Sequence, residues 1–221
     1  HLFAPSHVYQ IHAQREMLRR GLSDERYQDL LTAIKDQDSA VHGRVAAIYT
    51  LKQLAGDRCS KDLISLIDDA GVSVNVMRAL TDRLGELSGL EIGPFVEMLQ
   101  HEDPRVQAQA LISLGRIGDA TAAEAILPLT NRSPAFPVPE GTPLYKQADP
   151  GRVLPHLAVR ALVRCGSVEA CLQAIEGPYS DGALWALKYM HNTAAVHGLV
   201  KKLSEVRDAE VRQNIITTLI R

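Results

Sequence analysis

The 221-residue sequence predicts an all-α protein, a right-handed α-solenoid of about six to seven helical hairpins with one proline-rich insert. Two observations support this fold class. An apolar pattern recurs about every 30 residues, which is typical of stacked helical repeats rather than of one globular core. Valine, isoleucine and aromatic residues form no alternating run of strand length, so the sequence predicts no sheet.

The repeats align on one apolar position, which we expect to be buried in the first helix of every hairpin. Successive copies of this position are 34, 33, 30, 48, 25 and 32 residues apart. Because each hairpin would bury its open face against the next, residues 1–221 are expected to form a single repeat domain. The seven aligned positions are Met17, Leu51, Leu84, Leu114, Leu162, Leu187 and Leu219.

The fourth copy carries the clearest helix signals. Asp103 suits the N-cap of a helix, and Pro104 suits its first position. Gly118 follows the apolar stripe and predicts the end of that helix. A partner helix is expected over residues 122–130, with the inward side chains Ala125, Ile126 and Leu129.

The other copies of the repeat predict further hairpins. In the first copy, helices are expected over residues 6–20 and 24–35. Apolar spacing predicts inward side chains in the first helix of the third copy at Val76, Leu80, Leu84 and Leu87. The same spacing predicts inward side chains in the second helix of the sixth copy at Val196, Leu199, Val200 and Leu203. The last copy offers one helix, over residues 208–221, whose apolar face is expected to lack a partner.

One insert, residues 131–152, interrupts the rhythm of the repeats. Seven of the eleven prolines lie between residues 128 and 155, a density that predicts an irregular or polyproline-like loop. Phe136 and Tyr145 give this loop apolar groups with which to dock onto neighbouring helices. Both are therefore candidate interaction residues.

Charge and hydropathy narrow the classes of function. A net charge of −2 predicts no nucleic-acid partner, since such proteins usually carry a basic face. Arg19 and Arg20 form one of two basic doublets and are candidate interaction residues near a helix end. No apolar run is long enough to span a membrane, and no signal peptide is evident. The absence of an initiator methionine leads us to expect a fragment of a longer chain.

Catalytic and metal-binding patterns are not evident in the sequence. The histidine pairs His7 with His12 and His191 with His197 lack the spacing that places two metal ligands on one helix face. No Gly-x-Ser-x-Gly elbow and no glycine-rich phosphate loop is present, so we expect no cofactor in this segment. Cys165 and Cys171 flank a short turn, and the sequence leaves open a disulfide or two buried thiols.

The single tryptophan, Trp185, allows two interpretations. It packs against an adjacent element such as the proline-rich loop, or it is exposed and anchors a partner protein. In both interpretations it is a candidate interaction residue.

The stretch from Asp103 to Asp119 resembles HEAT-like repeats of the phycobilisome-lyase type, and the resemblance covers nearly the whole chain except the insert. It implies the solenoid fold and says little about function. A narrower stretch, from Asn131 to His191, is similar to the middle region of planctomycete-type proteins that combine a sorbosone-dehydrogenase-like propeller, HEAT-like repeats and a c-type haem domain. That similarity implies an exported, extracytoplasmic parent protein and no catalytic residue in this segment.

Three functions follow as hypotheses. The leading one is a non-catalytic scaffold or spacer, not an enzyme, that binds a protein or a neighbouring domain of the same polypeptide. The first alternative is a lyase related to the phycobilin-attaching HEAT-like proteins, for which Cys59 or Cys171 would be the reactive thiol. The second alternative is a nucleic-acid-binding solenoid, similar in form to the alkylpurine glycosylases.

Overall fold

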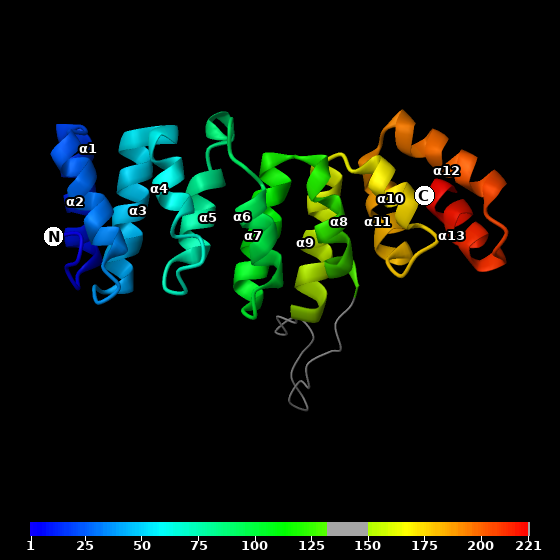
Figure 1. Cartoon of the computed structure of the whole chain (residues 1–221), viewed down its shortest axis with the longest axis horizontal. Helices are drawn as coiled ribbons and strands as arrows, with labels where there is room; N and C mark the ends of the chain where they lie inside the picture. The colour runs from blue at the N-terminus through cyan, green and yellow to red at the C-terminus, as the bar shows by residue number, and fades with distance from the viewer. Residues whose placement is uncertain (132–149, 221) are drawn as a thin grey trace, which may run out of the picture. The chain divides into compact units, whose positions relative to one another are not determined.

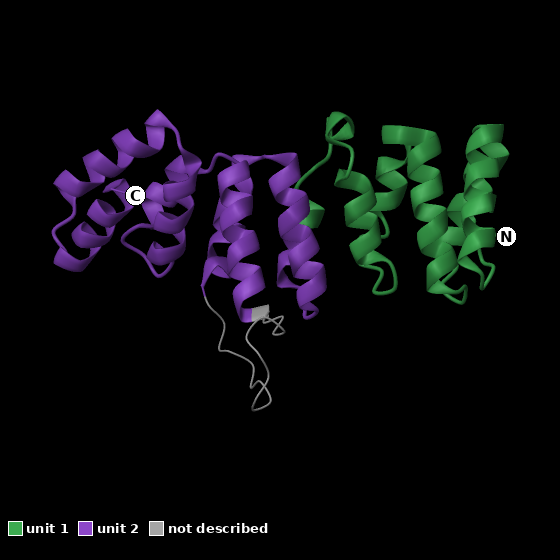
Figure 2. Cartoon of the chain, turned by 180° about the vertical axis from the view of Figure 1, so that it is seen from behind, with its two compact units in different colours: residues 1–95 green, residues 96–221 purple. Residues whose placement is uncertain are grey.

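A computed structural model gives the structure of the chain and describes residues 1–131 and 150–220 (Figure 1). Within these residues every regular element is helical and no strand is present, so the all-α prediction is confirmed. The described helices form six hairpins followed by one further helix, as in a HEAT-like solenoid. They gather into two compact units, His1–Phe95 and Val96–Arg221 (Figure 2). The single repeat domain therefore stays a prediction.

Unit 1 contains the first two hairpins and most of the third. The first hairpin confirms the predicted bounds, because Gly21 at φ 74° ends its first helix and Ser23 accepts a hydrogen bond from the Arg26 backbone amide. Helix α2 packs on α3, and α3 packs on α5. The helical elements are α1 (His7–Arg20), α2 (Asp24–Lys35), α3 (Val41–Ala55), η1 (Gly56–Cys59), α4 (Ser60–Ile64), α5 (Ser73–Thr81), η2 (Leu84–Glu86) and α6 (Gly93–Glu97).

The aligned apolar position is buried in four of the seven copies, and the third copy contradicts the prediction. Leu84 is 65% exposed, because α5 ends at Thr81 and the extended backbone of Arg83 turns the chain away from the core. Leu80 fills the core of this hairpin instead, with no exposed surface. The periodicity is correct up to Leu80, but the helix ends at Thr81, six residues before Leu87, the last position of the predicted stripe.

A buried ion pair connects three successive elements of unit 1. The side chain of Arg44, on α3, is 3% exposed, and its Nη2 lies 2.6 Å from Oδ2 of Asp69, whose side chain is 8% exposed. Arg44 Nε also donates a 2.7 Å hydrogen bond to the carbonyl oxygen of Ile34 near the end of α2. Hydrogen bonding to Arg44 is the main cause that lowers the pKa of Asp69. The pair therefore fixes α2, α3 and the turn before α5 to one another.

Replacing Arg44 by methionine is expected to destabilise the chain by about 3–5 kcal/mol, because it leaves the Asp69 carboxylate buried without a partner. Urea unfolding would measure this loss. Because the pKa of Asp69 is lower in the folded state, its contribution is present above its unfolded pKa, near 4, and is lost as the pH falls further. The difference between the variant and the wild type should therefore shrink below about pH 4.

The matched control is Arg19→Met, because Arg19 forms an exposed ion pair with Glu16 on its own helix. We expect this substitution to leave the unfolding midpoint unchanged. Equal effects of the two substitutions would contradict the importance of the buried pair.

Unit 2 contains the remaining hairpins. Helix α7 packs directly against α9, and α11 packs against α9, α10 and α13. Figure 1 shows these helices in colours that run from green at α7 to red at α13. Beyond the end of α6, the helical elements are η3 (Met98–Gln100), α7 (Pro104–Ile117), η4 (Ala120–Ala122), α8 (Ala123–Ile126), η5 (Leu127–Thr130), α9 (Pro150–Arg164), α10 (Val168–Ala174), α11 (Ser180–Met190), α12 (Thr193–Glu205) and α13 (Ala209–Ile220).

The predicted ends of α7 are confirmed. The Asp103 side chain accepts from the Arg105 amide at the N-cap, and Gly118 ends the helix in the left-handed conformation at φ 77°. The partner segment is helical but broken into η4, α8 and η5, which changes the phase of its side chains. Ile126 is buried as predicted. Ala125 and Leu129 are only half-buried, and the core contains Ala122, Ala123 and Leu127 instead.

The predicted insert is too long at its C-terminal end, because α9 begins at Pro150 and includes Pro155. Proline at the first position of a helix loses no intrahelical hydrogen bond. Pro155 does remove one such bond, but the burial of Leu154 and Ala158 beside it offsets the cost. The prolines at 150 and 155 therefore belong to a helix, and the loop predicted over the rest of the insert lies outside the described residues.

The last two repeats correct two further expectations. Val196 and Val200 of α12 are 49% and 54% exposed, so only Leu199 of the predicted stripe is fully buried. Helix α13 does have neighbours, because it packs on α11 and α12 and buries Ile215. Among the described residues, no helix combines the length and apolar character needed to cross a membrane.

Glycine allows close packing at two places in unit 2. A Cβ atom added to Gly115 would lie 3.2 Å from Cα of Ala161, so α7 and α9 approach backbone to backbone there. A Cβ atom added to Gly182 would overlap the side chain of Thr130, which is buried at the end of η5. Helix α11 therefore needs a residue without a side chain at this position.

Gly182→Ala is expected to destabilise the chain by about 1–3 kcal/mol, because the added methyl group overpacks the contact with Thr130. Thermal unfolding monitored by circular dichroism would measure the change. Gly85→Ala is the control, since a Cβ atom at Gly85 meets no atom within 4 Å. A variant at Gly182 as stable as the wild type would show that α11 can shift at no cost.

Candidate functional site

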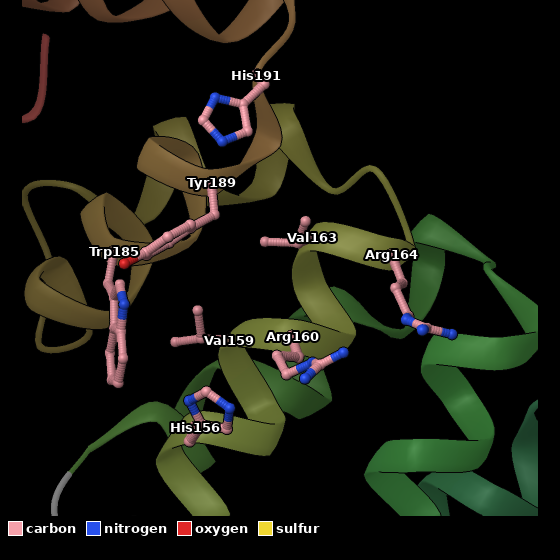
Figure 3. Close-up of a pocket in the computed structure, with 8 residues that line it drawn as sticks. All are labelled: His156, Val159, Arg160, Val163, Arg164, Trp185, Tyr189 and His191. Carbon is pink, nitrogen blue, oxygen red and sulfur yellow. The ribbon is translucent and has the colours of Figure 1, made fainter. Parts of the chain in front are cut away.

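A hollow of about 480 Å³ lies between α9 and α11 in unit 2 (Figure 3). Helix α9 contributes one wall and α11 with its C-terminal residue contributes the other. All of the lining positions come from residues 156–191, so the hollow lies entirely within one unit. The lining side chains are His156, Val159, Arg160, Val163, Arg164, Trp185, Tyr189 and His191.

Helical spacing places these side chains together. Val159 and Val163 are four residues apart on α9, and Trp185 and Tyr189 are four residues apart on α11, so each pair shares one face of its helix. His191 follows α11 in the left-handed conformation at φ 44°, the only such non-glycine residue in the described chain. This conformation is uncommon but is accessible to histidine.

The rings in the hollow form an aromatic wall. The ring centroids of Trp185 and His156 are 6.2 Å apart at an interplanar angle of 54°. Those of Tyr189 and His191 are 6.4 Å apart and nearly perpendicular, at 87°. Tyr189 is 50% exposed, so part of the wall is open to solvent. A flat, apolar molecule could stack on these rings.

The two arginines lie on the α7 side of the hollow. In Figure 3 the side chain of Arg164 extends away from Trp185 and Tyr189. Arg160 and Arg164 also line a second groove, of about 270 Å³, between α9 and α7. The site therefore has an aromatic part on one side of α9 and a cationic part on the other.

The structure contradicts a role for the cysteines as reactive thiols. Cys59, Cys165 and Cys171 are all free and buried, so no disulfide joins Cys165 to Cys171. Burial raises the pKa of Cys59 to about 11, of Cys165 to about 11 and of Cys171 to about 12. Burial in apolar surroundings favours the neutral thiol, which is a poor nucleophile.

All three thiols are expected to react at least a hundredfold more slowly with a thiol reagent at pH 7.5 in the folded chain than in urea. At that pH a thiol of pKa near 11 is ionised in fewer than about one molecule in a thousand. Absorbance of the released thiolate leaving group from a disulfide reagent would follow the reaction. A thiol that reacts at once in the folded chain would restore the covalent alternative.

The other candidate residues have mixed outcomes. Trp185 packs partly against His156 of α9, as the first interpretation predicts, but remains half-buried at the edge of a hollow. Arg19 and Arg20 both form ion pairs with Glu16 of their own helix. Phe136 and Tyr145 lie outside the described residues. Their roles as interaction residues stay predictions. Within residues 1–131 and 150–220, no cluster of three or more His, Cys, Asp or Glu could hold a metal ion.

The remaining lining residues of the hollow were not predicted from the sequence to form a site. A signal for them was present, because His156, Arg160 and Arg164 recur every four residues and the segment 150–164 contains no acidic residue. What the sequence does not contain is the pairing of α9 with α11, which brings Trp185 and Tyr189 to the same hollow.

Comparison with known proteins places the fold in a recognised class. Residues 106–131 match the family model of the PBS lyase HEAT-like repeat, so the chain is a HEAT-like repeat protein, as the sequence predicts. No curated protein matches the chain.

A solved structure shares the fold over most of its length. It is a chain in the structure of the complex of CpcE and CpcF of phycocyanin lyase from Nostoc sp. PCC7120. It is 19% identical in sequence, with a TM-score of 0.51, over 87% of this chain and 75% of that chain.

These likenesses overturn the leading functional hypothesis. The matching family model is that of the PBS lyase HEAT-like repeat, and the solved structure is of a phycocyanin lyase complex, so they contradict a non-catalytic scaffold and favour the lyase-type alternative. The prediction that this segment is not an enzyme was wrong for the same reason. It was based on the absence of contiguous catalytic motifs, which are not required where a site is assembled from side chains of separate helices.

Proposed function

We propose that this chain is a lyase-type HEAT-like protein that binds a phycobilin in the hollow between α9 and α11 and acts with a second protein. The aromatic hollow carries the proposal, because it lies in the unit that contains the family match. The likeness to a phycocyanin lyase complex supports the reaction class. That likeness by itself shows only the fold. The choice of a phycobilin as the bound molecule therefore has to rest on the chemistry of the hollow.

The hollow suits an open-chain tetrapyrrole in size and chemistry. A phycobilin is a conjugated, largely apolar chain of four rings that carries two carboxylates. The volume of about 480 Å³ lies within the usual range of small-molecule sites. Trp185 and Tyr189 offer ring faces on which the pyrrole rings can stack. Arg160 stands at the rim, where a guanidinium can bind a carboxylate through two hydrogen bonds.

The buried cysteines limit what this chain contributes to the reaction. Since Cys59 and Cys171 are not available as nucleophiles, the protein that accepts the chromophore has to supply the reacting group. This chain would bind and orient the chromophore. His156 and His191 can each donate or accept a hydrogen bond with a nitrogen or oxygen of the bound molecule.

A protein partner is consistent with this division of roles. The similar solved structure is a complex of two proteins. A chain that holds the chromophore but buries all three of its cysteines needs at least the acceptor as a second protein. We therefore retain the predicted protein partner and propose that it contributes to the lyase reaction.

Binding of phycocyanobilin to the full chain is expected to quench the fluorescence of Trp185 in a saturable way. Trp185 is the only tryptophan of the sequence, so all of the tryptophan fluorescence comes from a side chain that lines this hollow, and the tyrosine variants localise the binding. Replacing Tyr189 by alanine should weaken binding by roughly three- to tenfold, because one stacking face is lost. A fluorescence titration would measure both dissociation constants.

Tyr9→Ala serves as the matched control for this titration, because Tyr9 is a similarly exposed tyrosine, at 64%, in unit 1. Its dissociation constant should equal that of the wild type. Quenching that does not saturate, or equal effects of the two tyrosine substitutions, would refute the proposed site.

A further inference from the structure

A second hollow lies on the other side of α9, in the groove between that helix and α7. Its volume is about 270 Å³, which is small for a cofactor or drug-sized molecule. The floor is the close approach of Gly115 to Ala161. The groove can therefore accommodate one or two side chains from another molecule. It is lined by Leu111, Ile112, Gly115, Arg116, Leu157, Arg160, Ala161 and Arg164.

The charges of this groove are not explained by the fold. Arg160 and Arg164 are exposed, and neither forms an ion pair with a carboxylate in the part of the chain that the structure describes. Two like charges four residues apart on a helix repel each other and weaken that helix slightly. Helix α9 contains no acidic residue that would offset this repulsion. Among the described residues, the arginine pair therefore weakens α9 without gaining an ion pair in return.

The spacing of the two arginines indicates the kind of ligand. Side chains four residues apart on a helix are about 5–6 Å apart at their Cβ atoms, and two acidic residues four apart on another helix have the same Cβ spacing. Ile112 and Leu157, both partly exposed, add apolar surface beside the charges. A segment with two carboxylates and one apolar side chain would fill such a groove.

We propose that the groove between α7 and α9 is a docking surface for an acidic, amphipathic helical segment of a partner protein, with Arg160 and Arg164 binding its carboxylates. The inference is carried by the charge complementarity of the two guanidiniums, neither of which pairs with a carboxylate in residues 1–131 or 150–220. The surface goes beyond the proposed lyase function, because it requires no chromophore and uses none of the rings of the aromatic wall. It shares Arg160 and Arg164 with the first hollow, and the proposed function places Arg160 at a carboxylate of the chromophore. It uses the helix-in-groove mode of recognition.

A protein segment fits this groove better than a nucleic acid does. In residues 96–221, 13 basic and 13 acidic residues cancel, whereas nucleic-acid binding requires an extended basic face. The apolar side chains that flank the arginines would find no apolar group to pack against on a phosphate backbone. They would be buried against an apolar residue of an amphipathic helix.

Fluorescence anisotropy with the full chain would test the surface. The probe is a labelled 15-residue alanine-rich peptide with two glutamates four residues apart and a leucine between them, and its counterpart has glutamine at both positions. The glutamate peptide should bind at least tenfold more tightly, and its affinity should fall as salt is raised. Charge reversal of both arginines, R160E with R164E, should abolish the preference for glutamate.

Two control variants make the result specific. The double variant K201E with R207E changes the net charge by the same amount at exposed positions that do not line the groove, and it should keep the preference. Tyr189→Ala should also keep it, although that variant weakens phycobilin binding. Failure of the peptide test with intact phycobilin binding would therefore refute this surface alone, and the reverse result would refute the lyase proposal alone. Circular dichroism would confirm that each variant is folded.

Three outcomes would overturn the proposal. The first is equal binding of the glutamate and glutamine peptides to the wild-type chain. The second is tighter binding of a short DNA duplex than of the glutamate peptide at the same ionic strength, which would favour a nucleic-acid ligand. The third is displacement of the peptide by low millimolar inorganic phosphate, which would show a simple anion site.

Discussion

Each hairpin of this chain has an apolar face that its own two helices cannot cover, and the need to bury that face organises the rest of the structure. The next hairpin covers it, so the core of each unit is a series of contacts between neighbours rather than one centre. Small residues decide how close those neighbours come. At Gly115 and Ala161 two backbones meet, and at Gly182 a helix packs onto a buried threonine. The grooves on either side of α9 result from this close stacking.

The stacking of hairpins also determines whether a charged side chain is buried, where it stabilises the fold, or exposed, where it can bind a ligand. In unit 1, Arg44 and Asp69 are buried between hairpins. The Arg44 guanidinium binds both the Asp69 carboxylate and a backbone carbonyl oxygen. In unit 2, by contrast, the outer face of α9 carries arginines without carboxylate partners among the described residues, beside exposed aromatic rings. A buried charge must be paired for the fold to be stable, whereas an exposed one can remain available to a ligand. This difference separates the two units in chemistry, although both are built from the same repeat.

Function in such a fold comes from side chains on separate helices, so a search for contiguous motifs has little power. The eight residues of the aromatic hollow come from two helices and one helix end. None of them stands out as a catalytic signature in the sequence. The cysteines attracted attention as chemically reactive residues, yet burial makes them poor nucleophiles. Local surroundings, rather than residue type, decide which of these groups can act.

The sequence by itself determined the all-α class, the number of hairpins and the ends of helices such as α7, because these depend on spacing and on capping residues next to them in the chain. Tertiary structure alone decided that α5 stops before Leu84, that α12 exposes Val196, and that Trp185 meets His156. Apolar periodicity states which face of a helix is apolar. It does not state how long the helix is or which neighbour covers that face, because both depend on contacts with residues distant in the sequence.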